Sequence, residues 1–438
     1  MTLLDRDAGL VQAAAALVSG SESGKTPVSA SLAPINAAWL CVVASLGLAL
    51  LGVHAIDVAQ QLEPAGRADL ASEAARQLVF VIIGLIAAVL VALPHYKIAG
   101  YLAWPALVGC IGLLVFLLVP AVPTSIVAPR NGARAWSDVG PIDFQPSEVT
   151  KIAFVLVVAM YLRFRRKHRT LRGLVVPGLI AAVPVGLITL QPDLGTSSLF
   201  VPALFAMLIA AGAKLRHLGL IVLCAALAAP AAYPLLKDHQ KERLVAMVLQ
   251  FQGDTSTAGD INYQSLTAQR LIGAGGAGGH EDATARTLIH YNRLPERHND
   301  MVFAVIVNRF GFVGGLVVLG LYGLWIAGAL LTAGACRDPL GRIIAVGLCA
   351  FVFAQAVVNI GMNIGVLPII GITLPFVSYG GSSMVTSWLM TGLVMSVALH
   401  PARPPYRPSF EYDDDDRGGD GAYGKSAGFG GRALTRVG

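Results

Sequence analysis

The sequence has few charged residues: Asp, Glu, Lys and Arg make up 13% of its 438 residues, whereas hydrophobic residues make up 55%. An average soluble domain carries about 25% charged residues, so this composition excludes an ordinary soluble enzyme. It indicates a polytopic membrane protein. We therefore expect an all-α membrane fold, with the membrane as an obligatory partner and no nucleic-acid partner.

Cysteine is also scarce, and the five cysteines lie in or beside apolar segments rather than at paired positions in polar loops. This placement argues against a disulfide framework and a metal cluster, so we expect small apolar fillers. The N-terminal segment lacks the basic region ahead of a short apolar core that marks a cleaved signal peptide. The first apolar span is therefore the expected membrane anchor.

Long apolar runs, in contrast, are abundant. A transmembrane helix needs about 20 mostly apolar residues, and the sequence predicts about ten such spans, with a large extracytoplasmic loop between the seventh and the eighth. The predicted spans are Ala37–Ala55, Leu78–Leu93, Ile98–Val119, Val149–Leu162, Val175–Leu190, Ser198–Ala211, Leu218–Leu235, Met301–Leu331, Ile343–Ile364 and Met384–Leu399.

Basic segments between the spans predict the orientation, because such segments favour the cytoplasm. If the spans alternate, all of them fall on one side, and both termini are then cytoplasmic. These segments are Arg163–Arg172, Lys214–His217, Cys336–Arg342 and His400–Arg407. Three polar segments then face outwards, namely Pro120–Glu148, Leu236–Asp300 and Leu367–Ser383.

The two ends of the chain differ from the apolar middle. We expect residues 1–35 to be a disordered cytoplasmic extension and residues 36–400 to form the membrane domain. The acidic, glycine-rich residues 401–438 have no apolar periodicity, so a disordered cytoplasmic tail is predicted.

Glu148 and Lys151 introduce opposite charges at the start of the fourth predicted span. They are one turn apart and so share a helix face, and an ionisable residue within a span normally faces a polar site or a partner. An interfacial salt bridge that anchors the helix is the alternative. Trp136, in the loop before them, can likewise be an aromatic residue of the membrane interface.

Asp193 lies in the short connection "QPDLGTSS" between the fifth and sixth predicted spans. A carboxylate there favours a helix N-terminus, so capping is the expected role on local grounds. Because the connection is so short, Asp193 must also lie near the outer loops, which leaves a role in a shared site open.

The long outer loop contains the glycine-rich run "GAGGAGG", Gly273–Gly279. Glycines allow backbone to approach a ligand closely, although a flexible linker would have the same composition. No strand precedes the run, and its spacing is neither a dinucleotide fingerprint nor a P-loop, so a nucleotide site is rejected.

The stretch "LPERHND", Leu294–Asp300, places several charges just before the eighth predicted span. Partial desolvation at this edge would raise the pKa of Asp300, as suits a general base, whereas Arg297 nearby would oppose the shift. Capping of the span is an equally open alternative for Asp300.

The segment "NIGMNIGVLPIIGITLPFVSYGGSSM", Asn359–Met384, interrupts an apolar region with Pro368, Pro375 and the turn "YGGSS". It predicts a re-entrant loop. Non-helical backbone at membrane depth is tolerated only if it is buried in protein or lines a water-filled site, so this loop points to a binding site.

Four separated motifs, "GARAW" with "FQPSE" and Lys151, "QPDLGTS", "LPERHND" and "LPFVSYGGSS", resemble the SEDS family of shape, elongation, division and sporulation proteins in order and spacing. The resemblance covers nearly all predicted spans. It implies a peptidoglycan glycosyltransferase of the bacterial cytoplasmic (inner) membrane that polymerises lipid II into β-1,4-linked glycan on the outer face. It also implies a class B penicillin-binding protein as partner.

By the same resemblance, Asp300 is the catalytic residue, removing a proton from the acceptor sugar hydroxyl. No tightly held metal is expected, although a divalent cation, Mg²⁺ or Mn²⁺, could accompany the substrate pyrophosphate. The predicted substrate-binding residues are Lys151, Glu148, Arg134, Trp136, Gln145, Asp193, Glu296, His298, Ser378 and Ser382.

The motifs "FQPSE" and "NIGM" favour a role in cell elongation, with a division-type polymerase as the alternative. A flippase or transporter of lipid-linked precursors and a non-catalytic scaffold for the penicillin-binding protein are alternatives from other classes. A transporter would spread ionisable residues across the membrane thickness, whereas here they cluster at the outer edge.

The sequence departs from the resemblance at Asn308 and Arg309, where relatives carry two acids. An unpaired charge inside a span would be costly. We therefore expect Arg309 to have an acidic or carbonyl partner on another helix, or a route to water. We also expect it to turn away from lipid into the bundle and to help fix the eighth span.

Overall fold

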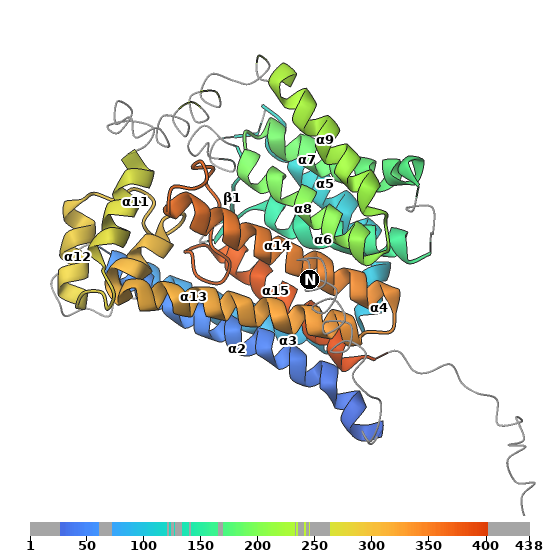
Figure 1. The fold of residues 1–438 in the computed structure, drawn as a ribbon, viewed down its shortest axis with the longest axis horizontal. Coiled ribbons are helices and arrows are strands. Elements are labelled where there is room, and N and C mark those ends of the chain that lie inside the picture. The colour runs from blue at the N-terminus through green and yellow to red at the C-terminus, as the bar shows by residue number, and fades with distance from the viewer. Residues whose placement is uncertain are drawn as a thin grey trace, which may run out of the picture. The chain divides into compact units, whose positions relative to one another are not determined.

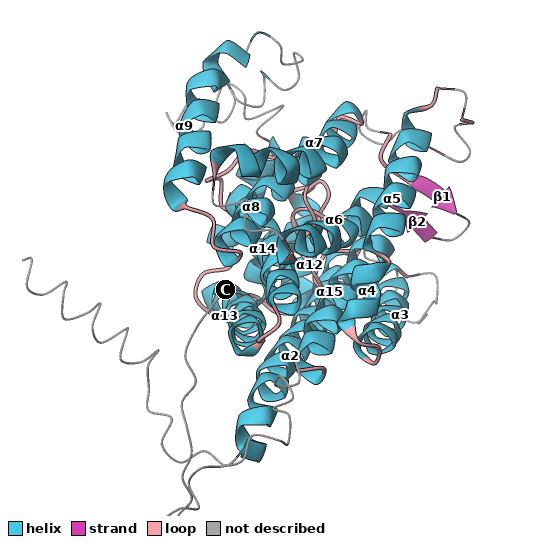
Figure 2. Ribbon diagram, turned by 90° about the vertical axis from the view of Figure 1, so that its right-hand side faces the viewer, coloured by secondary structure: helices cyan, strands magenta, loops and turns pink. Residues whose placement is uncertain are grey.

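The structure is a computed structural model that describes residues 27–60, 72–120, 122–123, 127, 134–139, 142–164, 170–232, 234, 241, 245 and 263–401. Helices dominate it (Figures 1 and 2). They are α2 (Pro27–Ala59), α3 (Glu73–Ala92), α4 (Tyr96–Tyr101), α5 (Ala103–Leu118), α6 (Pro146–Arg163), the 3₁₀ helix η2 (Leu171–Leu174), α7 (Val175–Leu190), α8 (Leu194–Ala210), α9 (Leu215–Ala232), α11 (Tyr263–Ala274), α12 (Asp282–Tyr291), α13 (Val302–Ala335), α14 (Pro339–Asn363) and α15 (Gly381–Leu399).

Every predicted span coincides with at least one helix, and the chain is an all-α polytopic membrane protein. By length and apolarity, six helical segments of the described chain could cross a membrane, and α5, α8 and α9 are apolar but shorter. Helix α6 carries the charges of Glu148, Lys151 and Arg163. One short hairpin, β1 (Ser137–Val139) paired antiparallel with β2 (Ile142–Phe144), precedes it.

One predicted span is not a single helix. The predicted third span divides into α4 and α5 at Leu102, because Pro105 can neither donate to the preceding turn nor fit against it. Residues 1–26 and 402–438 lie outside the described residues.

Small residues allow the long helices to pack closely. Helix α13 contacts α2 along one edge of Figure 1, α15 contacts α3, and α14 contacts α6 and α8. A Cβ atom at Gly392 of α15 would lie 2.4 Å from the carbonyl oxygen of Ala88 in α3, and one at Gly328 of α13 would lie 2.7 Å from that of Ala37 in α2. Glycine at these crossings permits backbone contact, as is common between membrane helices.

The segment predicted as a long outer loop contains helices α11 and α12, which contact α13. Helix α13 is interrupted at Gly311 (φ 67°). There the glycine-rich run supplies backbone partners, since Phe312 N donates to Gly276 O over 2.8 Å and Val313 N donates to Ala277 O over 3.3 Å. The glycines thus allow the backbone of the run to pack against the backbone of α13. The run is neither a ligand-binding loop nor a flexible linker.

Candidate active site

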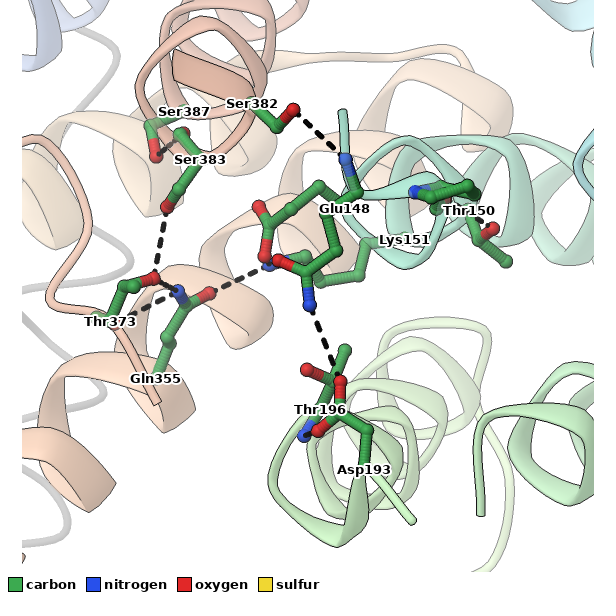
Figure 3. Close-up of polar contacts among 12 residues, drawn as sticks. Glu148, Thr150, Lys151, Asp193, Thr196, Gln355, Thr373, Ser382, Ser383 and Ser387 are labelled. Carbon is green, nitrogen blue, oxygen red and sulfur yellow. Dashed lines mark hydrogen bonds and ion pairs between the residues drawn. The ribbon is translucent and has the colours of Figure 1, made fainter. Parts of the chain in front are cut away.

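Lys151 and Glu148 lie on one face of α6, buried at 1% and 4% exposure. Lys151 Nζ lies 2.8 Å from Glu148 Oε1 and donates to Gln355 Oε1 of α14 over 2.9 Å. Figure 3 shows the two α6 side chains reaching towards Gln355. Lys151 therefore faces the protein interior rather than lipid, as predicted, and the pair is not a surface anchor.

A second carboxylate joins this group from the start of α8. Asp193 Oδ1 accepts a hydrogen bond from Thr196 N over 2.9 Å, which confirms the expected capping role. Its other oxygen accepts from Gln145 Nε2 over 3.3 Å. Burial raises the pKa of Asp193 above its ordinary value, although the hydrogen bonds from Thr196 oppose the shift.

Asp300 is half-buried at the loop that leads into α13. Its carbonyl oxygen accepts hydrogen bonds from Asn359 Nδ2 over 2.9 Å and Asn363 Nδ2 over 2.8 Å, both from α14. A Cβ atom added at Gly371 would lie 3.5 Å from Asp300 Oδ2. The Asp300 carboxylate thus lies beside the backbone of the re-entrant segment.

The re-entrant segment connects Asp300 with the Lys151 group. Gln355 Nε2, whose amide oxygen binds Lys151, donates to Thr373 O over 3.0 Å. Thr373 follows Gly371 by only two positions, and extended chain advances about 3.3–3.6 Å per residue. The Asp300 carboxylate and the contact between Gln355 and Lys151 therefore lie beside the same short stretch of backbone, residues 371–373. This stretch belongs to no helix.

Side chains of the re-entrant segment and of α15 fix neighbouring backbone. Ser378 Oγ donates to Asn299 O over 2.6 Å. Ser382 Oγ donates to Asp143 O over 2.8 Å and accepts from Gln145 N over 3.0 Å. Both predicted serines thus support the site through backbone contacts.

His298 and Glu296 precede Asp300 in the same loop. His298 Nε2 lies 3.1 Å from Glu73 Oε2 of α3. Burial, together with the positive charge of Arg297, lowers the pKa of His298 to about 4, so the ring is neutral at pH 7 and this contact is not an ion pair. Glu296 is exposed and accepts from Asn299 Nδ2 over 2.9 Å, so it orders the loop from outside.

Arg134 and Trp136 lie in the segment before β1. An amino group of Arg134 donates to Val122 O over 3.1 Å, which ties the arginine to its own loop. Trp136 is half-buried.

Four buried amides that we did not predict complete the site: Gln77, Gln355, Asn359 and Asn363. Gln77 Nε2 donates to Ser378 O over 2.9 Å and its Oε1 accepts from Gly380 N over 3.2 Å, which clips the re-entrant segment to α3. The three α14 amides could have been found from the sequence, because they recur every four residues and so share one helix face.

The described residues contain no group of three or more His, Cys, Asp or Glu side chains that could hold a metal. Glu148 and Asp193 are two carboxylates of the site, but one oxygen of Glu148 already accepts from Lys151. Mg²⁺ commonly uses one or two carboxylates together with substrate phosphates. The donors therefore fit a cation only if it enters with a phosphate-bearing substrate.

Residues 36–402 match the family model of the FtsW, RodA and SpoVE proteins, described as "Cell cycle protein". The chain belongs to this family. It is 35% identical to peptidoglycan glycosyltransferase MrdB of Escherichia coli over 68% of the chain and 79% of the relative. It is 33% identical to stage V sporulation protein E of Bacillus subtilis over 75% of the chain and 87% of the relative.

Solved structures agree with this assignment. A chain of a peptidoglycan synthase complex that coordinates polymerisation and crosslinking is 31% identical and superposes with a TM-score of 0.68, covering 82% of this chain and 97% of that one. The rod shape determining protein RodA of Thermus thermophilus is 28% identical with a TM-score of 0.59, covering 84% of this chain and 98% of that one. The expected family and fold are thereby confirmed.

Proposed function

We propose that this chain is a peptidoglycan glycosyltransferase that polymerises lipid II into β-1,4-linked glycan at the outer face of the bacterial cytoplasmic membrane. The family and its relatives named as peptidoglycan glycosyltransferases support the reaction class. The observation that carries the proposal is the convergence of Asp300 and the Lys151 group on residues 371–373.

Asp300 acts as the general base. Its carboxylate removes the proton from the acceptor sugar hydroxyl, the hydroxyl oxygen bonds to the donor anomeric carbon, and the bond to the lipid pyrophosphate breaks with its electron pair leaving on the phosphate. The fixed backbone of Asp300 suits this role, since a base must lie within hydrogen-bond reach of its proton.

Lys151 stabilises the negative charge that develops on the departing pyrophosphate. A lysine ammonium has three donors, and two of them are used by Glu148 and Gln355. The third has no partner among the residues that the structure describes and can donate to a phosphate oxygen. Fixed cations directed at developing charge stabilise a transition state without reorganisation.

Glu148 and Asp193 bind the substrate beside Lys151. Glu148 Oε2 is buried without a hydrogen-bond partner among the described residues, so it can accept from a substrate hydroxyl or from a cation. Mg²⁺ or Mn²⁺ arriving with the pyrophosphate would supply additional charge neutralisation there.

The proposed partner is a class B penicillin-binding protein that crosslinks the product. The similar chain in a synthase complex that couples polymerisation with crosslinking supports it. Likeness to a rod shape determining protein supports a role in elongation, and similarity to proteins named FtsW supports the division-type alternative. Both termini are proposed to be cytoplasmic, from the distribution of basic segments.

The test is polymerisation by purified full-length chain, with and without its class B partner, on lipid II. We expect glycan polymer, detected by gel separation and by digestion with a muramidase. If a relative such as MrdB polymerises lipid II in the same preparation and this chain does not, even with its partner, the proposed activity is wrong and a scaffold role is favoured.

A further inference from the structure

We propose that Asn359 and Asn363 of α14 are positioning residues that hold the backbone of Asp300 and set its place relative to Lys151. This inference rests on the proposed glycosyltransferase function, and it assigns a role to two buried residues that do not themselves touch the reacting atoms.

Both asparagines are completely buried, at 0% exposure. Their Nδ2 atoms donate to the same acceptor, the Asp300 carbonyl oxygen, over 2.9 and 2.8 Å. Asn363 Oδ1 also accepts from Ala304 N, in the first turn of α13, over 3.3 Å. Asn363 therefore binds the chain on both sides of Met301, where the loop becomes a helix.

The carbonyl groups just before Asp300 are held in the same way. His298 O accepts from Tyr379 N over 2.8 Å, and Asn299 O accepts from Ser378 Oγ over 2.6 Å. Three consecutive carbonyl groups thus have partners on the re-entrant segment or on α14. Residues 296–300 belong to no helix or strand, so these tertiary hydrogen bonds determine where Asp300 lies.

The same face of α14 also holds Lys151. Gln355, one turn before Asn359, accepts from Lys151 Nζ and donates to Thr373. Asn359 Nδ2 in addition donates to Ile372 O over 2.6 Å. One rigid helix face therefore fixes both ends of the proposed site, the base and the cation, against the backbone between them.

Polar side chains inside a membrane protein are costly unless they are fully hydrogen-bonded. A Leu side chain has the same branched arrangement of heavy atoms as Asn, although it is larger, and it carries no polar group that needs a hydrogen bond. A displacement of about 1 Å in a catalytic group can reduce the rate by about 10²-fold. The amides therefore have a clear value for catalytic geometry.

The test is Asn359→Leu and, separately, Asn363→Leu in the full-length chain with its partner, assayed on lipid II. Because two amides share one carbonyl, each variant leaves one donor in place, and folding should persist. We expect kcat to fall by about 10²-fold while KM, and binding of fluorescent lipid II, stay near the wild-type values.

Asn308→Leu is the matched control. Asn308 is also completely buried, and its Nδ2 also donates to a backbone carbonyl, Leu271 O, over 3.0 Å. That contact joins α13 to α11 and does not involve residues 298–300. We expect this control to leave kcat unchanged and to lower the melting temperature by no more than the α14 variants do, because Asn308 Oδ1 has no hydrogen-bond partner among the described residues.

If both α14 variants keep the kcat of Asn308→Leu, or if their defect lies in KM alone, the positioning role is overturned. Should Asn359→Leu not fold, Asn359→Ser retains a hydroxyl donor at lower volume, and an intermediate kcat is expected. An inactive wild-type chain would instead contradict the proposed function, so the two failures are distinguishable.

Discussion

Lys151 Nζ lies 2.8 Å from Glu148 Oε1, and both side chains are buried. Taking two charges out of water is costly, and breaking such a buried pair from one side costs about 3–5 kcal/mol because a single charge remains unmatched. A buried pair is therefore weak evidence for stability, since apolar residues of similar volume often do as well. We therefore attribute the buried pair to the reaction rather than to stability.

Lys151→Met separates these two contributions. The single variant should lose about 3–5 kcal/mol of stability because Glu148 stays buried without its partner. Adding Glu148→Gln should restore most of the melting temperature but no polymerisation, since the phosphate-facing cation is gone. Thermal unfolding and lipid II turnover measure the two effects, and a stable, active double variant would make the pair purely structural.

Asp300→Asn keeps the shape of the side chain and removes the base. We expect polymerisation to fall by about 10²–10⁴-fold, the usual contribution of a general base. The backbone hydrogen bonds to Asn359 and Asn363 are retained, so the melting temperature and lipid II binding should change little. Wild-type turnover in this variant would exclude Asp300 from the catalytic role.

His298 should make the protein sensitive to acid. Its pKa is lowered from 6.5 to about 4 in the folded state, so between these pH values the unfolded chain binds the extra proton. The free energy of unfolding is therefore highest above pH 6.5 with respect to this group, and it decreases as the pH falls towards 4. Thermal unfolding at pH 7.5, 6 and 5 should show less acid sensitivity in His298→Gln than in wild type.

The exposed His290 provides the control for this comparison, and His290→Gln should keep the acid sensitivity of wild type. The sign of the effect is diagnostic. If Glu73 instead held a charged His298 as an ion pair, the pKa would be raised and wild type would gain stability relative to His298→Gln on acidification. That result would show that the contact with Glu73 outweighs burial.

Arg309 has one carboxylate partner and one carbonyl partner. Its Nε contacts the carboxylate of Asp282 in α12, and its Nη1 donates to His280 O over 2.9 Å. Burial of Asp282 opposes ionisation, but the hydrogen bond and charge of Arg309 outweigh it and lower the pKa of Asp282. The prediction of an acidic or carbonyl partner is thus confirmed, with both partners in the outer segment.

Arg309→Leu should lower stability by about 1 kcal/mol, because a partly exposed ion pair is screened and contributes roughly 0.2–1 kcal/mol and the His280 carbonyl loses a donor. Arg270→Leu, at an exposed position of α11, is the control and should be nearly neutral. Equal melting temperatures for the two variants would mean that the Arg309 contacts contribute nothing measurable.

The sequence predicted the helices well, because a span of apolar residues has few alternatives to a helix in lipid. The resemblance to a known family, and not residue spacing, placed Glu148, Lys151 and Asp300 in one predicted site. The sequence did not predict Gln77, whose two hydrogen bonds join α3 to a segment far along the chain. A single amide in an apolar span identifies no partner, because tertiary packing chooses that partner.

The glycine-rich run shows the same limit, because its composition fits a linker, a ligand loop and a packing contact equally well. The structure selects the packing contact, and adjacent glycines differ sharply in it. A Cβ atom at Gly279 would lie 2.2 Å from Arg309 O, at a φ of +78°, whereas one at Gly278 would meet nothing within 4 Å. These two positions therefore make a matched pair for experiment.

Gly279→Ala should destabilise the attachment of the outer segment to α13. The left-handed backbone alone costs an alanine about 1–2 kcal/mol, and the overlap with Arg309 O forces the run away from the break at Gly311. Gly278→Ala has free space at its Cβ and should be nearly neutral. Hydrogen exchange of the Phe312 amide, which donates to Gly276 O, reports the contact directly. Equal protection in both variants would mean that α13 keeps its break without the glycine-rich run.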